Sequence, residues 1–213
     1  AIVIIPTYNE RENIRAIIEA VFALPKDFHI LIVDDNSPDG TAAIVADLQQ
    51  GYNTPAETKL HLLQRMGKLG LGTAYITGFH YCLQKGYNYI LEMDADFSHD
   101  PKDLVRLYLA CSEQGSDVSI GSRYATGVNV VNWPIGRVLL SYFASSYVRM
   151  ITGLPIRDTT AGFVCYHHKV LQTIPLDSIK FVGYAFQIEM KFLTWKYGFK
   201  LAEVPIIFTD RTR

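Results

Sequence analysis

Two aspartates separated by one alanine, Asp94 and Asp96, follow an apolar run in the middle of the chain. Two carboxylates that face one point repel each other, and a hard cation such as Mg²⁺ or Mn²⁺ relieves that repulsion while keeping positions for water and phosphate. The alternative is a solvated turn that caps a helix starting near Pro101, with Ser98 or Asp100 as the cap. The position of the pair directly after a fully apolar strand favours the metal site.

Polar and acidic residues also follow three other apolar runs. In an open α/β sheet, ligands bind outside the carboxyl ends of the strands, so these residues are expected to share one edge with Asp94 and Asp96. The three groups are Pro6-Thr7-Tyr8-Asn9-Glu10, Asp34-Asp35-Asn36-Ser37-Pro38-Asp39-Gly40-Thr41 and Gly121-Ser122-Arg123-Tyr124. Their convergence is stronger evidence for a ligand site than any one motif.

The pair Asp34 and Asp35 has more than one interpretation. Residues 37–40 have the composition of a turn, and Asp39 is able to cap the helix that follows. In a ligand site, Asp35 would accept a hydrogen bond from a base N–H. A phosphoacceptor aspartate, as in receiver domains, is a rival use, although this chain is nearly twice the usual length of such a domain.

The segment 68–74 is rich in glycine but does not match a dinucleotide-binding loop. A G-x-G-x-x-G pattern starting at Gly70 would need glycine at position 75, where Tyr75 stands. A flexible entry to a helix and a contact with phosphate or ribose both remain open. The sequence has no G-x-S-x-G elbow, and its six histidines show no metal-ligand spacing, although His99 lies near the aspartate pair.

Arg123 and Arg137 are candidates for binding phosphate, because a guanidinium group stays charged and donates two parallel hydrogen bonds to phosphate oxygens. They lie close to an aromatic and apolar stretch that begins at Trp133 and continues through Tyr147. That stretch is either ordinary core or an amphipathic helix in a membrane interface, where aromatic residues flanked by arginines are favoured.

Short apolar runs alternate with longer amphipathic segments over residues 1–120, which is typical of an α/β fold. Right-handed crossovers turn such a succession into a mostly parallel, doubly wound sheet flanked by helices. Expected strands cover 2–5, 29–33, 59–63, 87–93, 117–121, 163–167 and 200–209; expected helices cover 10–24, 40–50, 72–84, 103–114 and 186–197, with one or two amphipathic helices over 134–153. We expect a single domain over 1–213, in which residues 125–213 complete the sheet and cover the site.

The composition narrows the class of protein. The 213 residues are 49% hydrophobic, and a net charge of −1 gives no general attraction to nucleic acid. Three cysteines far apart, without a C-x-x-C pair, favour reduced and buried thiols. No uninterrupted apolar run reaches the roughly 18 residues of a membrane-spanning helix. The start at Ala1 inside an apolar run and the stop at Arg213 lead us to expect a trimmed chain with a tail missing.

Together these motifs resemble the family 2 glycosyltransferases of the GT-A fold, and within that family the dolichyl-phosphate (polyprenyl-phosphate) mannose synthases. The resemblance runs nearly end to end, and the motifs are highly specific as a set, although P-x-Y-N-E and D-A-D occur separately in many members. It rests on residues 6–13, 34–41, 68–75, 93–96, 98–99, 121–124 and 204–211.

The resemblance implies a nucleotide-sugar- and metal-binding half over 1–124 and an acceptor side over 125–213. The guanosine end of GDP-mannose would be held by Pro6, Tyr8, Glu10, Val33 and Asp35. The diphosphate and a Mg²⁺ or Mn²⁺ ion would be held at Asp94, Ala95 and Asp96, with Ser98 as a further metal ligand. Some relatives have glutamine where Ser98 stands, which weakens its assignment.

Three arginines, Arg123, Arg137 and Arg211, would engage the diphosphate and the lipid phosphate, and Arg123 and Arg211 would also belong to the donor site. Asp96, Arg123 and Arg137 would carry the catalysis. Family members continue with a Gly-x-Ser-Lys tail whose lysine also meets phosphate, and this chain ends before that tail.

The implied reaction is an inverting transfer of mannose from GDP-mannose to dolichyl or polyprenyl phosphate. The acceptor phosphate is ionised at neutral pH, so no strong general base is required. The lipid acceptor implies a peripheral position on the cytoplasmic face of a membrane, with contact through segment 134–153; some relatives rely on a small membrane-anchoring partner. The alternatives are a UDP-glucose or other nucleotide-sugar donor, and a non-catalytic nucleotide-sensing module, which the presence of both Asp94 and Asp96 disfavours.

Overall fold

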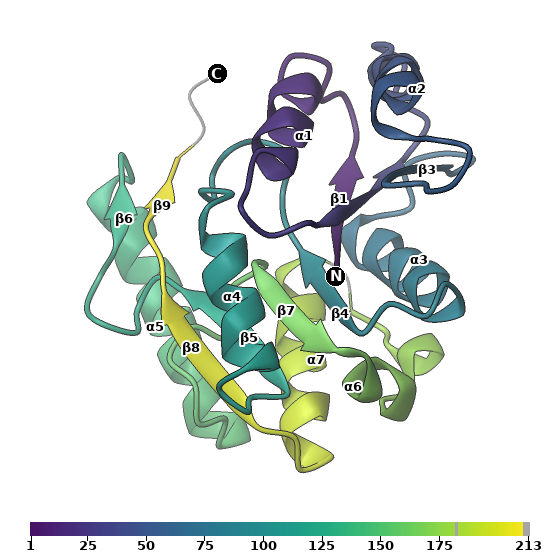
Figure 1. Cartoon of the computed structure of the whole chain (residues 1–213). Coiled ribbons are helices and arrows are strands. Elements are labelled where there is room, and N and C mark those ends of the chain that lie inside the picture. The colour runs from purple at the N-terminus through teal and green to yellow at the C-terminus, as the bar shows by residue number, and fades with distance from the viewer. Residues whose placement is uncertain (182, 211–213) are drawn as a thin grey trace.

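A seven-stranded sheet forms the centre of the molecule, in the strand order β3-β2-β1-β4-β7-β5-β8 (Figure 1). We analysed a computed structural model, which describes residues 1–181 and 183–210. The strands of this sheet are β1 (Ile2–Thr7), β2 (His29–Asp34), β3 (Leu60–Gln64), β4 (Tyr89–Glu92), β5 (Val118–Ser122), β7 (Val164–His167) and β8 (Leu201–Pro205). Two short strands, β6 (Val130–Val131) and β9 (Phe208–Thr209), pair with each other in a separate sheet.

The central sheet is parallel except for β7. Strand β1 runs parallel to both β2 and β4, whereas β7 lies between β4 and β5 and runs antiparallel to both. The mostly parallel α/β sheet predicted from the sequence is therefore confirmed. The direction of β7 places its first residue, Val164, opposite Glu92 at the end of β4. The residues that precede β7 consequently reach the same edge of the sheet as the residues that follow β4.

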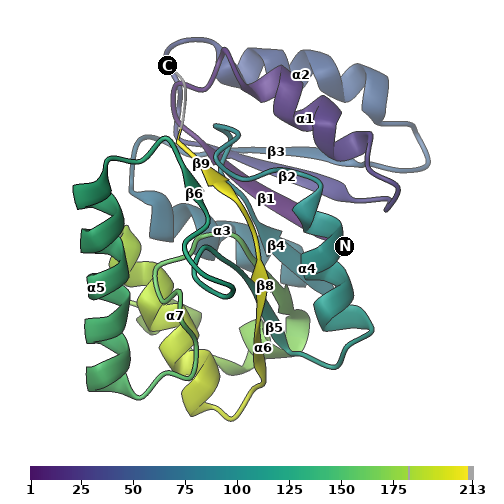
Figure 2. The same cartoon turned by 90° about the vertical axis from the view of Figure 1, so that its left-hand side faces the viewer.

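Helices cover both faces of the sheet (Figure 2). One face packs against α1 (Ile14–Phe22), α2 (Thr41–Tyr52) and α4 (Asp103–Ser112), and the other against α3 (Leu71–Gln84), α6 (His168–Thr173) and α7 (Tyr184–Lys196). Because both faces are buried, strands such as β1 are apolar at successive positions and do not alternate. The packing is close: a Cβ at Gly78 of α3 would lie 2.9 Å from the side chain of Ile4.

The second half of the chain agrees with the expected elements at the helix over 134–153 and departs from them elsewhere. The strand expected over 200–209 is divided into β8 and β9. The buried Ile206 donates its N–H to the Ser122 carbonyl at the end of the pairing with β5, and the chain beyond it pairs with β6. The segment over 134–153 is one helix, α5 (Ile135–Thr152), which ends at Gly153 with a φ of 74°. Strand β6 and helix α6 were not expected, since both are too short to show a period.

Helix α5 differs from the other helices in its exposure. Ser145 is its one buried residue, and α5 lies along the outside of the molecule next to α7 (Figure 2). None of the helices in the described part of the chain is long and apolar enough to cross a membrane. All three cysteines are buried and reduced, as the sequence predicted.

Candidate active site

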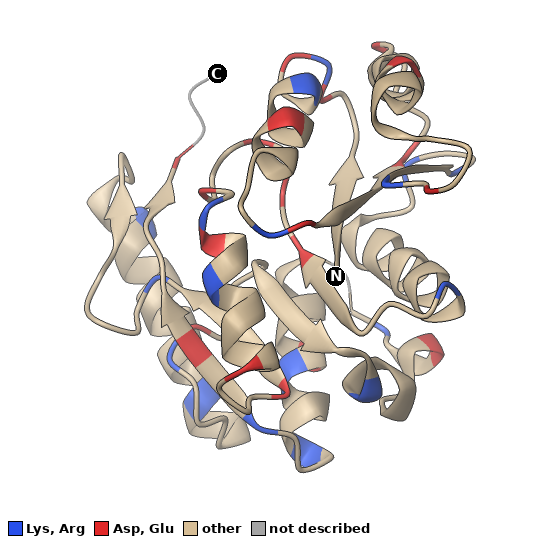
Figure 3. Ribbon diagram, viewed as in Figure 1, with Lys and Arg blue, Asp and Glu red and all other residues tan. Residues whose placement is uncertain are grey.

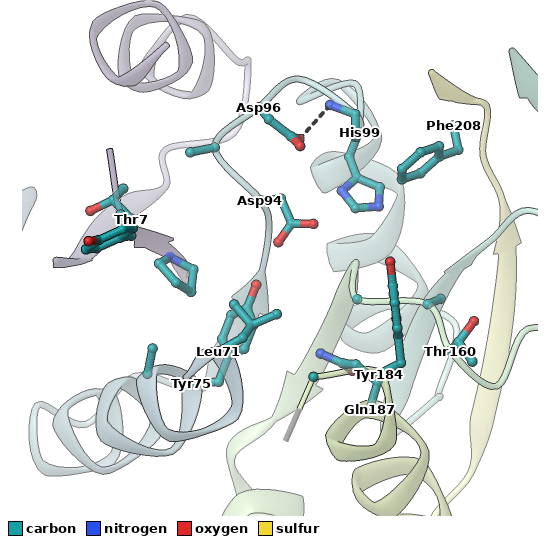
Figure 4. A pocket seen from close by; sticks show the side chains of 18 of the residues that line it. Thr7, Leu71, Tyr75, Asp94, Asp96, His99, Thr160, Tyr184, Gln187 and Phe208 are labelled. Atoms are coloured by element: carbon teal, nitrogen blue, oxygen red, sulfur yellow. Dashed lines mark hydrogen bonds between the residues drawn. The ribbon is translucent and has the colours of Figure 1, made fainter. Parts of the chain in front are cut away.

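A cavity of about 430 Å³ lies at the carboxyl ends of the parallel strands, where the sequence predicted a ligand site (Figure 4). The predicted residues that line it are Pro6, Tyr8, Glu10, Asp35, Asp94, Ala95, Asp96, Ser98, Arg123 and Arg137. Val33 is not among them, because its side chain is fully buried in the core on the α3 face of the sheet. Arg211 lies outside the described residues.

The aspartate pair follows β4 directly. The N–H of Met93 still donates to the carbonyl of Ile4 of β1, and the chain turns only after that point. Asp96 accepts a hydrogen bond of 3.0 Å from the N–H of Ser98, across a turn in which Phe97 has a φ of 57°. The separate carboxylate of Asp100 accepts from the N–H of Lys102 just before α4. Asp100 thus closes the turn before α4, and the pair lines the cavity.

These residues fit a hard divalent cation. Asp94 and Asp96 supply carboxylate oxygens, and the buried Ser98 places a hydroxyl in the wall of the same cavity. Among the described residues, no third His, Cys, Asp or Glu side chain joins these two carboxylates, and no other group of three or more such side chains could hold a metal ion. Two carboxylates leave most of the coordination sphere to water and phosphate oxygens, which is how Mg²⁺ is usually bound together with phosphorylated substrates.

At the β2 end of the cavity, Asp35 is held by Arg65. The Arg65 Nε donates to Asp35 at 2.6 Å, while its Nη1 donates to Thr73 at 2.8 Å and its Nη2 to the carbonyl of Gly70 at 3.3 Å. Arg65 therefore joins the end of β2 to the glycine-rich segment before α3. Arg65 was not predicted from the sequence. It directly follows β3, so the expectation that ligands bind at the carboxyl ends of strands could have identified it.

The neighbouring Asp34 has a structural role. It is fully buried and accepts hydrogen bonds from the hydroxyls of Thr7 and Ser37 at 2.8 and 2.6 Å. The glycine-rich segment 68–74 lines the cavity through Lys68, Gly70 and Leu71, and Lys68 Nζ lies 4.3 Å from the centre of the Tyr8 ring. This placement favours ligand contact over a flexible helix entry.

Arg123 is buried and forms an ion pair with Asp158. Its Nε and Nη2 donate to the two carboxylate oxygens of Asp158 at 2.7 and 2.6 Å, and Nη2 also donates to Thr160 at 2.8 Å. Burial opposes ionisation of Asp158, but the hydrogen bonds and charge of Arg123 hold the pKa of that carboxyl below its ordinary value. Asp158 was not predicted, and no local pattern in the sequence identifies it.

Arg137 lies beside Arg123 in a more exposed position. Its Nη1 donates to both oxygens of Asp210 at 3.0 and 2.9 Å. The indole ring of Trp133 lies 4.3 Å from the Arg137 guanidinium carbon and 5.5 Å from that of Arg123. The structure therefore brings together the two arginines predicted to bind phosphate, around one aromatic ring.

His99 lines the cavity but is not poised for proton transfer. Its ring stacks on Phe163 at 4.7 Å between centroids and meets Phe208 edge-on at 5.2 Å. Burial lowers the pKa of His99 to about 4, with nearby charges having smaller effects. The imidazole is therefore neutral at physiological pH, which agrees with a reaction that needs no strong base.

The chain matches a family model and curated proteins over most of its length. The model of glycosyl transferase family 2 matches residues 2–175. A polyprenol monophosphomannose synthase of Mycolicibacterium smegmatis is 45% identical over 210 residues, which cover 99% of this chain and 77% of that protein. An undecaprenyl-phosphate mannosyltransferase of Micrococcus luteus is 42% identical over 208 residues, covering 98% of this chain and 83% of that protein.

Solved structures share the fold at low sequence identity. Glucosyl-3-phosphoglycerate synthase of Mycobacterium tuberculosis, in complex with Mn²⁺, UDP and glucosyl-3-phosphoglycerate, aligns with a TM-score of 0.69 at 16% identity, over 100% of this chain and 72% of that one. The same enzyme has also been solved with Mg²⁺ and UDP. The predicted GT-A fold is thereby confirmed, and the chain belongs to glycosyl transferase family 2 as an enzyme of that family.

Proposed function

We propose that the protein is an inverting glycosyltransferase that moves mannose from GDP-mannose to a dolichyl or polyprenyl phosphate. One observation carries this proposal: a single cavity has the Asp94–Asp96 pair at its centre and the Trp133-centred arginines, Arg123 and Arg137, on one side. A nucleotide diphosphate and a second phosphate would both find complementary charge there. The names of the two curated relatives, one a polyprenol and one an undecaprenyl-phosphate enzyme, support the same acceptor class.

The donor would lie across the carboxyl ends of β1, β2 and β4. Asp35, oriented by Arg65, would accept from a base N–H, with Pro6, Tyr8 and Glu10 beside it. Asp94 and Asp96 would hold Mg²⁺ or Mn²⁺ against the diphosphate; the ion would supply charge that stabilises the departing phosphate oxygens.

The acceptor phosphate would enter on the side of the two arginines. One of its ionised oxygens forms the new bond to the anomeric carbon, while the bond from that carbon to the β-phosphate oxygen breaks and the electron pair leaves with GDP. Arg137, partly exposed beside Trp133, would orient the incoming phosphate. Arg123 adds positive charge from a buried position, and its ion pair with Asp158 fixes its geometry.

Helix α5 would bring the protein to the membrane. Trp133 and Arg137, at the start of this helix, line the cavity, and the helix carries exposed apolar side chains along its length. These side chains are Ile135, Leu139, Leu140, Tyr142, Phe143, Tyr147, Met150 and Ile151. An apolar helix face that starts at the acceptor side suits peripheral contact with a bilayer that holds the lipid phosphate, at the cytoplasmic face.

The direct test is a transfer assay with purified protein, a short-chain polyprenyl phosphate, Mg²⁺ or Mn²⁺, and each nucleotide sugar in turn. We expect GDP-mannose to support transfer and EDTA to abolish it. Transfer from UDP-glucose in its place would keep the reaction class and overturn the donor. If the chain binds nucleotide sugars but transfers from none of them, the nucleotide-sensing alternative is favoured.

Membrane contact has a separate test. The double variant Leu140→Glu/Phe143→Glu changes two exposed side chains of α5, whereas Ile207→Glu changes an exposed isoleucine far from that helix in the sequence and serves as the matched control. In flotation with vesicles that contain anionic lipid, we expect the double variant to lose binding and the control to keep it. Equal binding of both variants to the vesicles would show that α5 does not make the membrane contact.

A further inference from the structure

A buried polar group lies under the acceptor side of the cavity, formed by Glu92 of β4 and by Gln187 and Lys191 of α7. Gln187 is 2% exposed, and the other two side chains are fully buried. Gln187 nevertheless lines the cavity, on the α7 side and below Asp94 in Figure 4. Polar side chains are seldom buried without a structural or functional reason.

The neighbours of Gln187 fix the orientation of its amide. Its Nε2 donates to Glu92 Oε2 at 2.8 Å, and its Oε1 accepts from Lys191 Nζ at 3.2 Å. Lys191 is itself anchored, because its Nζ donates at 2.6 Å to the carbonyl of Ala161 and at 3.1 Å to the carbonyl of Gln187. A rotated amide would place its NH₂ group against the Lys191 ammonium group, which donates hydrogen bonds and accepts none. The nitrogen is therefore held towards Glu92.

This arrangement leaves a hydrogen-bond donor at the cavity. An amide nitrogen carries two hydrogens, and among the described residues only Glu92 accepts one of them. The wall beside this nitrogen is kept open by Gly162, where an added Cβ would lie 3.7 Å from Gln187 Nε2. Gln187 thus presents an N–H, and no acceptor, to whatever occupies this part of the cavity.

We propose that Gln187 is a specificity-determining residue that donates a hydrogen bond to a hydroxyl group of the transferred sugar. This inference rests on the proposed function. With the base at Asp35 and the diphosphate at Asp94 and Asp96, the sugar lies beyond the diphosphate, on the side formed by Gly162, Tyr184 and Gln187. A hydroxyl oxygen accepts from a fixed amide donor, and an analogue lacking that hydroxyl leaves the donor unpaired.

The experiment compares the binding of GDP with that of GDP-mannose, both with Mg²⁺, by calorimetry. In Gln187→Met, which keeps the length of the side chain, we expect the affinity for GDP-mannose to fall about tenfold more than the affinity for GDP. Gly162→Ala, which leaves the buried group intact and places a methyl over the amide, is expected to shift the ratio in the same direction. Thr194→Val, in a buried side chain of α7 away from the cavity, is the control and should leave the ratio unchanged.

Analogues of GDP-mannose that each lack one hydroxyl identify the contact. One analogue should bind the wild-type chain and Gln187→Met with nearly equal affinity, because the contact is missing in both. The inference is overturned if every analogue preserves the difference, or if Gln187→Met and Gly162→Ala weaken GDP and GDP-mannose alike. Failure of the wild-type chain to bind any nucleotide sugar would instead overturn the proposed function, and the inference with it.

Discussion

The two edges of the central sheet hold polar groups in different ways. At the carboxyl edge, the cavity is built on full charges in pairs, Arg65 with Asp35 and Arg123 with Asp158. Figure 3 shows that acidic and basic residues are otherwise spread over the helices, strands and loops of the chain. The amino edge instead holds a chain of rings that contains His29, Tyr87, His61 and Tyr81.

The chain of rings is satisfied without any charge on the rings. His29 Nε2 faces Glu57 at 3.4 Å, which favours the tautomer with the proton on that nitrogen. With that assignment, His29 Nδ1 accepts from Tyr87 at 2.7 Å and Tyr87 accepts from His61 Nε2 at 3.0 Å. His61 Nδ1 then accepts from Tyr81 at 2.9 Å. The comparison teaches that the ion pairs at the cavity edge are buried, whereas the ion pairs at the amino edge, such as Lys59 with Asp27, are partly exposed and the ring chain beside them is joined by neutral hydrogen bonds.

The largest expected effect of a substitution lies at the charged edge. Asp94→Asn and Asp96→Asn should each reduce transfer by roughly a thousandfold, because under the proposed function each removes a charge that would hold the cation at the diphosphate. Thermal unfolding should change little, since both residues lie in the wall of a cavity. Transfer rates and unfolding midpoints measured on the same preparations decide the point; activity within tenfold of wild type would contradict it.

Substitution of the two arginines should affect the free energy of unfolding to different extents. Arg123→Ala leaves the fully buried Asp158 without its partner and should cost about 3–5 kcal/mol in the free energy of unfolding. Arg137→Ala breaks an exposed pair with Asp210 and should cost less than about 1 kcal/mol, while still reducing the use of the acceptor. Urea unfolding and acceptor kinetics measure both. Similar losses of stability in the two variants would refute the distinction.

The chain of rings at the amino edge should make the stability of the protein sensitive to acid. Burial, with smaller contributions from the charges of His29 and Lys85, lowers the pKa of His61 to about 4. As the pH falls, His61 therefore takes up a proton in the unfolded chain before it does so in the folded one. The stability that neutral His61 contributes is fully present above about pH 6.5 and is lost progressively towards pH 4. At about 1.4 kcal/mol per pH unit, His61 accounts for about 3 kcal/mol of this loss.

His61→Gln tests this assignment. The free energy of unfolding should fall less steeply between pH 6.5 and 4 in the variant than in the wild-type chain, with the buried His99 accounting for part of the slope that remains. Urea titrations at a series of pH values provide the curves. Parallel curves for the two proteins would show that His61 is not the group that titrates.

The smallest effect concerns the hydroxyl that joins the two histidines. Tyr87→Phe leaves His29 and His61 without their shared partner and should cost about 1 kcal/mol of stability. Transfer activity should be unchanged, because the hydroxyl lies at the edge of the sheet opposite the cavity. Tyr197→Phe, at a half-exposed tyrosine, is the control. A change in the affinity for donor in Tyr87→Phe alone would mean that the two edges are coupled.

Local pattern was enough to predict most of the fold and the centre of the site. Apolar runs bounded by turn residues identified the strands, and the strand-end rule placed Asp94 and Asp96 in the cavity. The direction of β7 could not be predicted, because a strand of four residues, three of them buried, looks the same in either orientation. Asp158 was missed for a related reason: it lies 35 residues from Arg123 in the sequence, and their pairing follows from the strand order.

The buried polar group had a weak signal that was not used. Gln187 and Lys191 lie four residues apart in a helix whose neighbouring buried residues include Phe186 and Met190. Polar side chains at that spacing on a buried helix face indicate a partner in the core. What the sequence could not supply was Glu92, which ends an otherwise apolar strand and contacts Gln187 across 95 positions.

The reversed direction of β7 has a consequence for engineering. The side of the cavity that holds Asp35 and Asp94 is made by loops that leave strands, whereas Thr160, Ala161 and Gly162 reach the cavity just before β7 begins. A chimaera of two family members joined near the end of β5 would therefore have to fit β7 and β8 of one parent against β4 and β5 of the other, because β7 lies between those two strands. Such a chimaera must take Arg123 together with Asp158, so the graft should start immediately after Ser122. A junction placed one residue later would take the two members of this buried ion pair from different parents.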